Sequence, residues 1–315
     1  MGGLFVFFIT KATTPELPTA NSPILFYANQ SRHDLKLIFC EAIHQAQQSI
    51  HATFYGITDR DVIRALAKQA KLGKDLTVEY DPTASLSLGK HFPSSATITP
   101  RRSKGLMHRK ILIIDHSILY LGSANLTLPS LHHHGNFVMG LYSPSFAEFL
   151  THPSSTHYVQ ALDSQELHCF LLPEKKQQAL HHLLSLIDNA KKSVRVAMFT
   201  FTHPLLIDAL IRAWQRGIDV AVVVDYYSGR GASKKAVARL TSEDVPITFS
   251  RGQELLHHKW AIIDDTTFAM GSANWTKAAF VKNEDFLLSL SPLTSDQIQF
   301  LNRLWRVLEL ESSSQ

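Results

Sequence analysis

Only two cysteines, Cys40 and Cys169, occur in the 315-residue sequence, so a disulfide-dense scaffold is excluded and both thiols are expected to be free and buried. No apolar run is long enough to span a bilayer, and no segment is of low complexity. A G-x-S-x-G nucleophile elbow is also missing, which argues against a serine esterase. Charged residues make up 18% of the chain and hydrophobic residues 45%, the balance of an ordinary globular protein.

The formal net charge is only +4, with a pI near 9, which suits an anionic partner but does not choose between nucleic acid and anionic lipid. The apolar stretch LFVFFI within residues 1–10 is too short for a membrane helix and follows no basic region. Soluble, peripheral-membrane and exported locations therefore all stay open. Among 17 histidines, the run 132–134 has no cysteine or acidic neighbour at metal-ligand spacing, so we interpret it as a loop.

A stretch of 29 residues occurs twice, and the two copies align without a gap. The first runs from His108 to Asn136 and the second from His257 to Asp285, with ten identical positions. Both contain the pattern H-x-K-x-x-x-x-D, followed by G-S-A-N at the same offset. A chance double match with this internal spacing is very improbable, so the repeat carries structure and chemistry.

The His and Lys of each copy are placed to face the same space. The apolar residues that follow each Lys predict a buried strand, and residues two apart on a strand share a face. His108 and Lys110 therefore project together, as do His257 and Lys259, about 7 Å apart along each strand. Each copy thus offers one imidazole and one ammonium group.

The remaining shared residues favour phosphate binding and scaffolding. Asp115 and Asp264 have the opposite strand parity and stand where the apolar run breaks, so a turn or scaffold role competes with a catalytic one. The Gly-Ser-Ala-Asn segments have small side chains, which lets backbone N–H groups approach an anion closely. The side chains expected to hold or orient a phosphate in these segments are Ser123, Asn125, Ser272 and Asn274.

The repeat extends upstream, where residues 49–81 align with 193–225 and each has the pattern of a strand, a helix and a strand. Helical periodicity precedes both units, and a closing helix is predicted over 295–310 on the second half. We therefore predict an α/β fold of two homologous α-β-α sandwich halves with mixed sheets, related by a pseudo-twofold axis. The expected boundaries are a leader over 1–23, a first half over 24–151, a linker over 152–166 and a second half over 167–315.

A pseudo-twofold axis would bring two imidazoles and two ammonium groups into one site. Nothing in this set of side chains predicts a bound metal or another cofactor. The groups fit a phosphodiester: one His attacks phosphorus, the other protonates the leaving oxygen, and Lys, Asn and Ser hold the non-bridging oxygens. Basic residues in the loop-rich segments 82–107 and 226–256 stand directly upstream and could line the entrance.

Over residues 24–310 the chain closely resembles the phospholipase D superfamily of H-K-D phosphodiesterases. The residues that carry this resemblance, and that it implies are catalytic, are His108, Lys110, Asp115, His257, Lys259 and Asp264. The resemblance implies a covalent phosphohistidine, released by water or an alcohol without a metal. It also implies that the first motif supplies the nucleophile and the second the acid.

One position departs from the family pattern. Members place a carboxylate 28 residues after the motif His to accept its Nδ1 proton, and this position is Asp285 in the second half but Asn136 in the first. We therefore expect His257 to pair with Asp285 and His108 with Asn136, with Glu284 as an alternative carboxylate. A carboxylate raises the proton affinity that an acid needs, whereas a neutral amide suits a nucleophile. Exchanged roles for the two His stay open.

The favoured function is hydrolysis of glycerophospholipids at a membrane surface, in the manner of a phospholipase D. The alternative is a nuclease, because the second motif resembles the small nuclease and cardiolipin-hydrolase branch of the superfamily. Apolar residues at 106–107 and 255–256, directly before each His, favour lipid, and basic residues are not interleaved with aromatics as a base-stacking groove requires. A non-catalytic scaffold is disfavoured because both His and both Lys are present.

Overall fold

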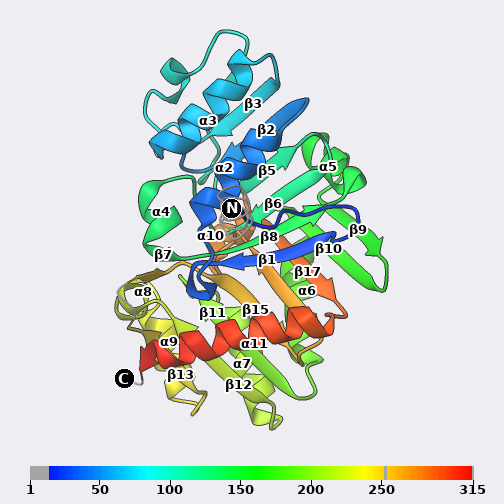
Figure 1. Ribbon diagram of the computed structural model, residues 1–315. Helices are drawn as coiled ribbons and strands as arrows, with labels where there is room; N and C mark the ends of the chain where they lie inside the picture. The colour runs from blue at the N-terminus through cyan, green and yellow to red at the C-terminus, as the bar shows by residue number, and fades with distance from the viewer. Residues whose placement is uncertain (1–13, 252–253, 314–315) are drawn as a thin grey trace, which may run out of the picture.

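Two mixed sheets form the centre of the molecule, one in each half of the chain (Figure 1). The computed structural model describes residues 14–251 and 254–313, so residues 1–13 of the predicted leader lie outside the described part. The strands of the first sheet are β1 (Ile24–Ala28), β2 (Ser49–Phe54), β3 (Asp75–Tyr80), β4 (Thr97–Pro100), β5 (Lys110–Ile114), β6 (Ile118–Gly122) and β8 (Phe137–Tyr142).

The strands of the second sheet are β9 (His157–Leu162), β10 (Gln165–Leu171), β11 (Ser193–Met198), β12 (Asp219–Val224), β13 (Ile247–Ser250), β15 (Lys259–Ile263), β16 (Thr267–Gly271), β17 (Phe286–Ser291) and β18 (Ser312–Ser313). A small two-stranded sheet pairs β7 (His134–Gly135) with β14 (Leu255–Leu256). Because β7 belongs to the first half and β14 to the second, this pairing joins the two halves.

The strand order of the two sheets repeats. The first sheet reads β1-β8-β6-β5-β2-β3-β4, and the second contains the equivalent order β10-β17-β16-β15-β11-β12-β13, extended by β9 and β18 at its two ends. In both sheets three parallel strands adjoin a run of antiparallel ones. The predicted α/β fold of two homologous halves with mixed sheets is therefore confirmed.

Helices pack on the faces of both sheets. Those of the first half are η1 (Asn29–Ser31), α2 (Leu35–Gln45), α3 (Arg60–Lys71), η2 (Leu88–His91), α4 (Leu128–His132) and α5 (Pro144–Thr151). Those of the second half are α6 (Gln178–Asp188), α7 (Pro204–Gln215), α8 (Tyr226–Arg230), α9 (Lys234–Thr241), α10 (Lys277–Val281) and α11 (Ser295–Leu310). In the part of the chain that the structure describes, none of them is long and apolar enough to cross a membrane.

Local sequence signals set the ends of these helices. Asp59 begins α3 because its carboxylate accepts hydrogen bonds from the N–H groups of Asp61 and Val62, and Gly73 follows the helix with a φ of 85°. Helix α2 begins only at Leu35, although Ser31 is also a residue type that can begin a helix. A 3-10 turn and a left-handed residue, Arg32, come first, and Asp34 then supplies the cap.

Three main clusters of buried apolar residues make up the core. One lies between the first sheet and α2 and α3, and another lies between the second sheet and α6 and α7. The third joins the two sheets, where the rings of Phe137 and Phe268 are 4.9 Å apart. Helix α11 was expected to pack on the second half alone, yet Phe300 contacts Phe26 of β1 because the helix closes this shared cluster.

The segment 152–166, expected to be a linker, contains regular secondary structure. Residues 152–166 contain β9 and the start of β10, which pair antiparallel and extend the edge of the second sheet. Alternate residues of β9 are half-buried, and Tyr158 stacks on Phe146 of α5 at 5.3 Å. The segment rich in Pro, Ser and His is therefore mostly ordered sheet, because its few apolar residues cover α5.

Candidate active site

The predicted His and Lys side chains stand where two equivalent central strands begin. His108 and Lys110 are at the start of β5, and His257 and Lys259 are at the start of β15. Since β5 runs antiparallel to β2, and β15 to β11, these starts lie at the edge where the parallel strands end. All four residues are buried, with relative exposures of 7%, 1%, 8% and 2%.

Each imidazole is held by a side chain from the other half. His108 Nδ1 lies 2.8 Å from Asp285 Oδ1, and His257 Nδ1 lies 2.9 Å from Asn136 Oδ1. The expected pairs within one half are therefore wrong. The backbone explains the exchange, because His108 N–H donates to the carbonyl of Glu284 and His257 N–H donates to that of Gly135.

Two serines of the Gly-Ser-Ala-Asn segments orient these partners. Ser123 Oγ donates to Asn136 Oδ1 at 2.8 Å, and Ser272 Oγ donates to Asp285 Oδ1 at 2.6 Å. Each hydroxyl also accepts the N–H of the residue that follows the partner, at 3.1 and 3.0 Å. These hydroxyls therefore orient the partners of the imidazoles, and their protons are not free for the phosphate that they were expected to hold or orient.

The two asparagines of the same segments keep an amide N–H₂ available. Asn274 Oδ1 accepts the N–H of Thr200 at 3.2 Å, which fixes the amide. Asn125 Oδ1 is buried and has no partner among the described residues. Neither Nδ2 donates to any residue within 14–251 or 254–313, so both can serve a bound anion.

The structure does not bring Asp115 and Asp264 into the site. Each follows the far end of its strand, five residues past the Lys, and has a left-handed backbone with φ of 50° and 56°. Asp115 accepts the N–H groups of residues 47–49, and Asp264 those of 191–193, at 2.7 to 3.1 Å. These carboxylates cap the turn before β2 and β11, so the scaffold alternative is the one the geometry supports.

Burial dominates the electrostatics. It lowers the pKa of Lys110 to about 7 and, with help from Lys110, lowers that of Lys259 well below its ordinary value. Each ammonium donates to the carbonyl of its own motif His, at 2.5 and 2.8 Å. The site is therefore a basic, poorly solvated space in which a bound anion would favour charged lysines.

The imidazoles are not equivalent. Burial and then Lys110 lower the pKa of His108, but the carboxylate of Asp285 opposes this. Burial and then Lys259 lower the pKa of His257 much further, since its partner is a neutral amide. Burial would raise the pKa of Asp285, yet the charges of His108 and Lys110 keep it below the usual value.

Sequence reasoning missed the aromatic rings and the carboxylates behind the site. The rings of Tyr55 and Phe199, at equivalent positions, lie 5.5 Å from His108 and 5.0 Å from His257. Asp81 and Asp225 accept the N–H of the residue before each His, at 3.4 and 3.2 Å. These positions are equivalent in the aligned repeat 49–81 and 193–225. Tyr55 and Phe199 are both aromatic but not identical, so they did not stand out as candidate site residues.

Glu284, the alternative partner, binds Arg101 at 3.1 Å and not an imidazole. Within residues 14–251 and 254–313, no three His, Cys, Asp or Glu side chains come together as metal ligands. The described residues therefore form a basic site with two imidazoles and without a cluster of metal ligands.

A family model described as "Cardiolipin synthase, PLD-like domain" matches residues 39–152 and 183–305, which take in both motifs and most strands of both sheets. The chain belongs to the phospholipase D superfamily. It is similar to a mitochondrial cardiolipin hydrolase of Xenopus tropicalis, 31% identical over 134 residues that cover 41% of this chain and 61% of the relative. It is also similar to cardiolipin synthase 2 of Staphylococcus epidermidis, 25% identical over 292 residues, 76% of this chain and 59% of that protein.

The chain thus spans about three fifths of the length of these curated relatives. The solved structure of phosphatidylserine synthase from Haemophilus influenzae Rd KW20 superposes with a TM-score of 0.74, covering 97% of this chain and 90% of that one. Its sequence identity is 13%, so it supports the fold of the phospholipase D superfamily and nothing finer.

The capping role predicts that Asp115→Ala and Asp264→Ala each lower the free energy of unfolding by about 1 to 3 kcal/mol, because three consecutive backbone N–H groups lose a charged acceptor. Cleavage of a soluble phosphodiester by the folded variants should stay within about twofold of the parent, since a shift that small is about 0.4 kcal/mol of barrier. Urea denaturation and initial rates measure the two quantities.

Asp265→Ala is the matched control, because Asp265 also has a left-handed φ of 54° but its carboxylate has no hydrogen bond among the described residues. A loss of activity in Asp115→Ala without a loss of stability would place this carboxylate in the chemistry.

Proposed function

We propose that this chain is a phospholipase D-type phosphodiesterase that hydrolyses glycerophospholipids through a covalent phosphohistidine on His108. The observation that supports it most is the pair of imidazoles, each with Nδ1 held by a buried partner. Each Nε2 makes no hydrogen bond with a described residue, so both are available for chemistry. Because His108 is held by Asp285 and His257 by Asn136, each imidazole lies against a residue of the other motif, which supports a single shared site.

In the first step His108 Nε2 attacks phosphorus, and the bond from phosphorus to the leaving alcohol oxygen breaks. The imidazolium of His257 gives its Nε2 proton to that oxygen. Lys110, Lys259 and the Nδ2 groups of the two site asparagines hold the non-bridging oxygens, where negative charge is concentrated.

In the second step a water molecule attacks the phosphohistidine. Neutral His257 removes a proton from the water, and the P–N bond breaks to release phosphate ester and neutral His108. His257 thereby regains the proton that it gave up, so the cycle needs no other acid or base.

The unequal partners suit this division of work. A ring that carries phosphorus on Nε2 and a proton on Nδ1 is cationic, and Asp285 stabilises that charge at 2.8 Å. His257 has only an amide partner, so its imidazolium is the stronger acid, and the anionic substrate supplies the charge that favours its protonation. Because the partners are exchanged, the carboxylate holds the nucleophile and the amide holds the acid, which is the reverse of the arrangement expected from the sequence.

The assay that tests the function offers purified protein phosphatidylcholine, cardiolipin and single-stranded DNA, each with and without EDTA. We expect release of a head-group alcohol and phosphatidic acid from phospholipid, at a rate that EDTA leaves unchanged because imidazoles carry the chemistry. Cleavage of DNA alone would establish the nuclease alternative, and activity that returns only on adding a divalent metal would contradict the mechanism.

The crossed partners predict opposite shifts of the pH profile of kcat/KM. Asp285→Asn removes the carboxylate that raises the pKa of His108, so the acidic limb should move to lower pH and the rate should fall about 10- to 100-fold. Asn136→Asp should raise the pKa of His257 and move the alkaline limb to higher pH.

Glu284→Gln is the matched control for Asp285→Asn, because Glu284 is adjacent but binds Arg101, and it should leave both limbs in place. Quenching turnover and mapping the phosphorylated peptide completes the trial. Phosphate on the peptide that contains His257, with none on that of His108, would reverse the assignment.

The lowered pKa of Lys110 predicts weaker anion binding at alkaline pH. Below about 7 the ammonium is charged and attracts an anion, and above that value it is lost, so affinity decreases as pH rises. The inhibition constant for sulfate, which stays a dianion throughout, should rise by up to about tenfold per pH unit for one linked proton. A constant that does not change between neutral and alkaline pH would contradict this.

A further inference from the structure

One edge of the two sheets gathers the loops that surround the site. Strands β2, β3 and β6 end at this edge, and β5 and β8 begin there, with the equivalent strands of the second half in the same positions. We call the segments at this edge the site rim. It consists of residues 55–60, 81–88, 101–107, 123–136, 199–205, 225–235, 254–258 and 272–285. In Figure 1, α4, β7 and α8 follow one another down one side of the molecule as part of it.

Exposed large apolar side chains concentrate on the site rim. Six of the ten that the described residues contain belong to it, and they come from both halves. They are Leu86, Leu106, Leu128, Leu205, Tyr227 and Val281, with relative exposures from 39% to 81%. Single exposed leucines are ordinary, but a group of them around one site indicates an interaction surface.

Positive charge accompanies them. The exposed basic residues of the site rim are Arg60, Arg102, Lys104, Arg230, Lys234, Lys235, Lys277 and Lys282. Its carboxylates are mostly hidden: Asp59, Asp81, Asp225 and Asp285 are buried. Glu284 is half-buried against Arg101, which leaves Glu254 as the one exposed carboxylate among the described residues of the rim. A chain with a net charge of only +4 therefore presents a strongly basic face around its site.

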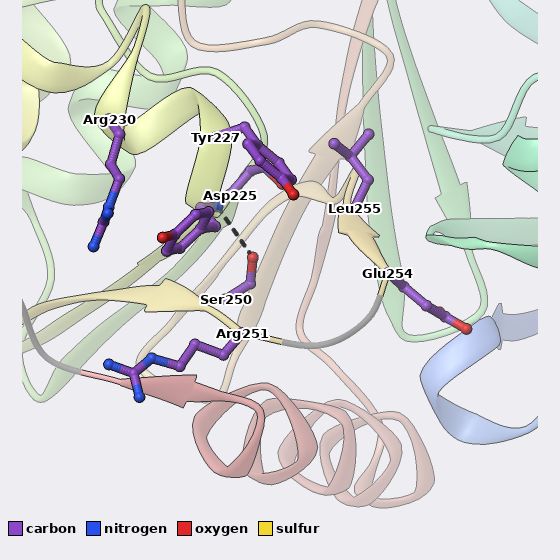
Figure 2. A pocket seen from close by; sticks show the side chains of 8 residues that line it. Asp225, Tyr227, Arg230, Ser250, Arg251, Glu254 and Leu255 are labelled. Atoms are coloured by element: carbon purple, nitrogen blue, oxygen red, sulfur yellow. Dashed lines mark hydrogen bonds between the residues drawn. The ribbon is translucent and has the colours of Figure 1, made fainter.

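Two pockets open along the site rim, one in each half. The pocket of about 420 Å³ in the second half is lined by Tyr226, Tyr227 and Arg230, and the Arg230 guanidinium lies 4.4 Å from the Tyr226 ring. Figure 2 shows Arg230 and Arg251 extending to the same side, while Glu254 points away. In the described part of the chain, no carboxylate lies within 4.0 Å of either guanidinium.

The pocket of the first half, about 440 Å³, is lined by Arg60 and Leu86 together with Leu88, His91 and Arg64, whose guanidinium is paired with Asp61 at 2.8 Å. It combines guanidinium groups with an exposed leucine, as the rim does as a whole. Both pockets therefore offer a cationic wall beside an apolar one, which matches a lipid phosphate next to its acyl chains.

We propose that the site rim docks on the surface of a bilayer that contains anionic phospholipids, with its leucines and Tyr227 entering the interface and its lysines and arginines contacting lipid phosphates. The proposal rests on the proposed function, because the substrate then lies in the same surface. Apolar insertion and electrostatic attraction act together, as stable peripheral binding requires. Aliphatic side chains make this partner fit better than nucleic acid, which is bound by aromatic stacking and phosphate contacts.

Sedimentation with vesicles tests the surface. The parent protein should bind vesicles of phosphatidylcholine with phosphatidylglycerol more tightly than vesicles of phosphatidylcholine alone, and salt should weaken the binding. Leu86→Ser with Tyr227→Ser should weaken binding about tenfold or more. Arg102→Gln with Lys104→Gln should cost about fivefold per charge on anionic vesicles only.

Leu72→Ser and Lys71→Gln are the matched controls, since Leu72 is 63% exposed at the opposite end of α3, away from the site rim. All these variants should cleave the soluble diester bis(4-nitrophenyl) phosphate at the parent rate. Failure of the parent on that diester would sink the proposed function, whereas normal cleavage without vesicle binding would sink only the docking surface. Retention of single-stranded DNA that the Arg102 and Lys104 substitutions weaken, with no binding to vesicles, would assign the rim to nucleic acid instead.

Discussion

Removing four basic side chains from water is the constraint on which this site depends. Lys110, Lys259 and two imidazoles are buried where the halves meet, and Asp285 is the one carboxylate that bonds to any of them among the described residues. Backbone carbonyls and amide oxygens satisfy the other donors without neutralising their charge. Burial consequently lowers the pKa of both lysines, and an anion bound beside them would favour their charged forms.

The duplication of the fold allows the two imidazoles to have unequal partners. Neither half contains a complete pair of imidazole and partner, because His108 needs Asp285 and His257 needs Asn136 from across the interface. A site of this kind exists only when the two halves are docked, through the shared apolar cluster and the pairing of β7 with β14. Once the halves are joined in one chain, each partner can change alone, and a carboxylate on one side with an amide on the other separates the chemistry of two similar histidines.

The two edges of the sheets serve different needs. At one edge strand ends and strand starts deliver the imidazoles, the lysines and the loops of the site rim. At the other edge Asp115 and Asp264 hold the turns that precede β2 and β11, so the motif aspartates support the strands that carry the chemistry from a distance. Each H-x-K-x-x-x-x-D motif therefore spans a whole strand, with its His and Lys in the site at one end and its Asp holding a turn at the other end.

The sequence by itself determined the repeat, the strand that carries each His and Lys, and the α/β pattern of each half, because these depend on local periodicity and spacing. It also showed that the partners at 136 and 285 are unequal. Only the tertiary structure decided whose imidazole each partner holds. Strand parity sets the face on which a side chain lies, but it says nothing about the chain on the far side of an interface. The capping role of Asp115, the sheet within 152–166 and the place of α11 between the halves were decided in the same way, since each depends on contacts between residues distant in sequence.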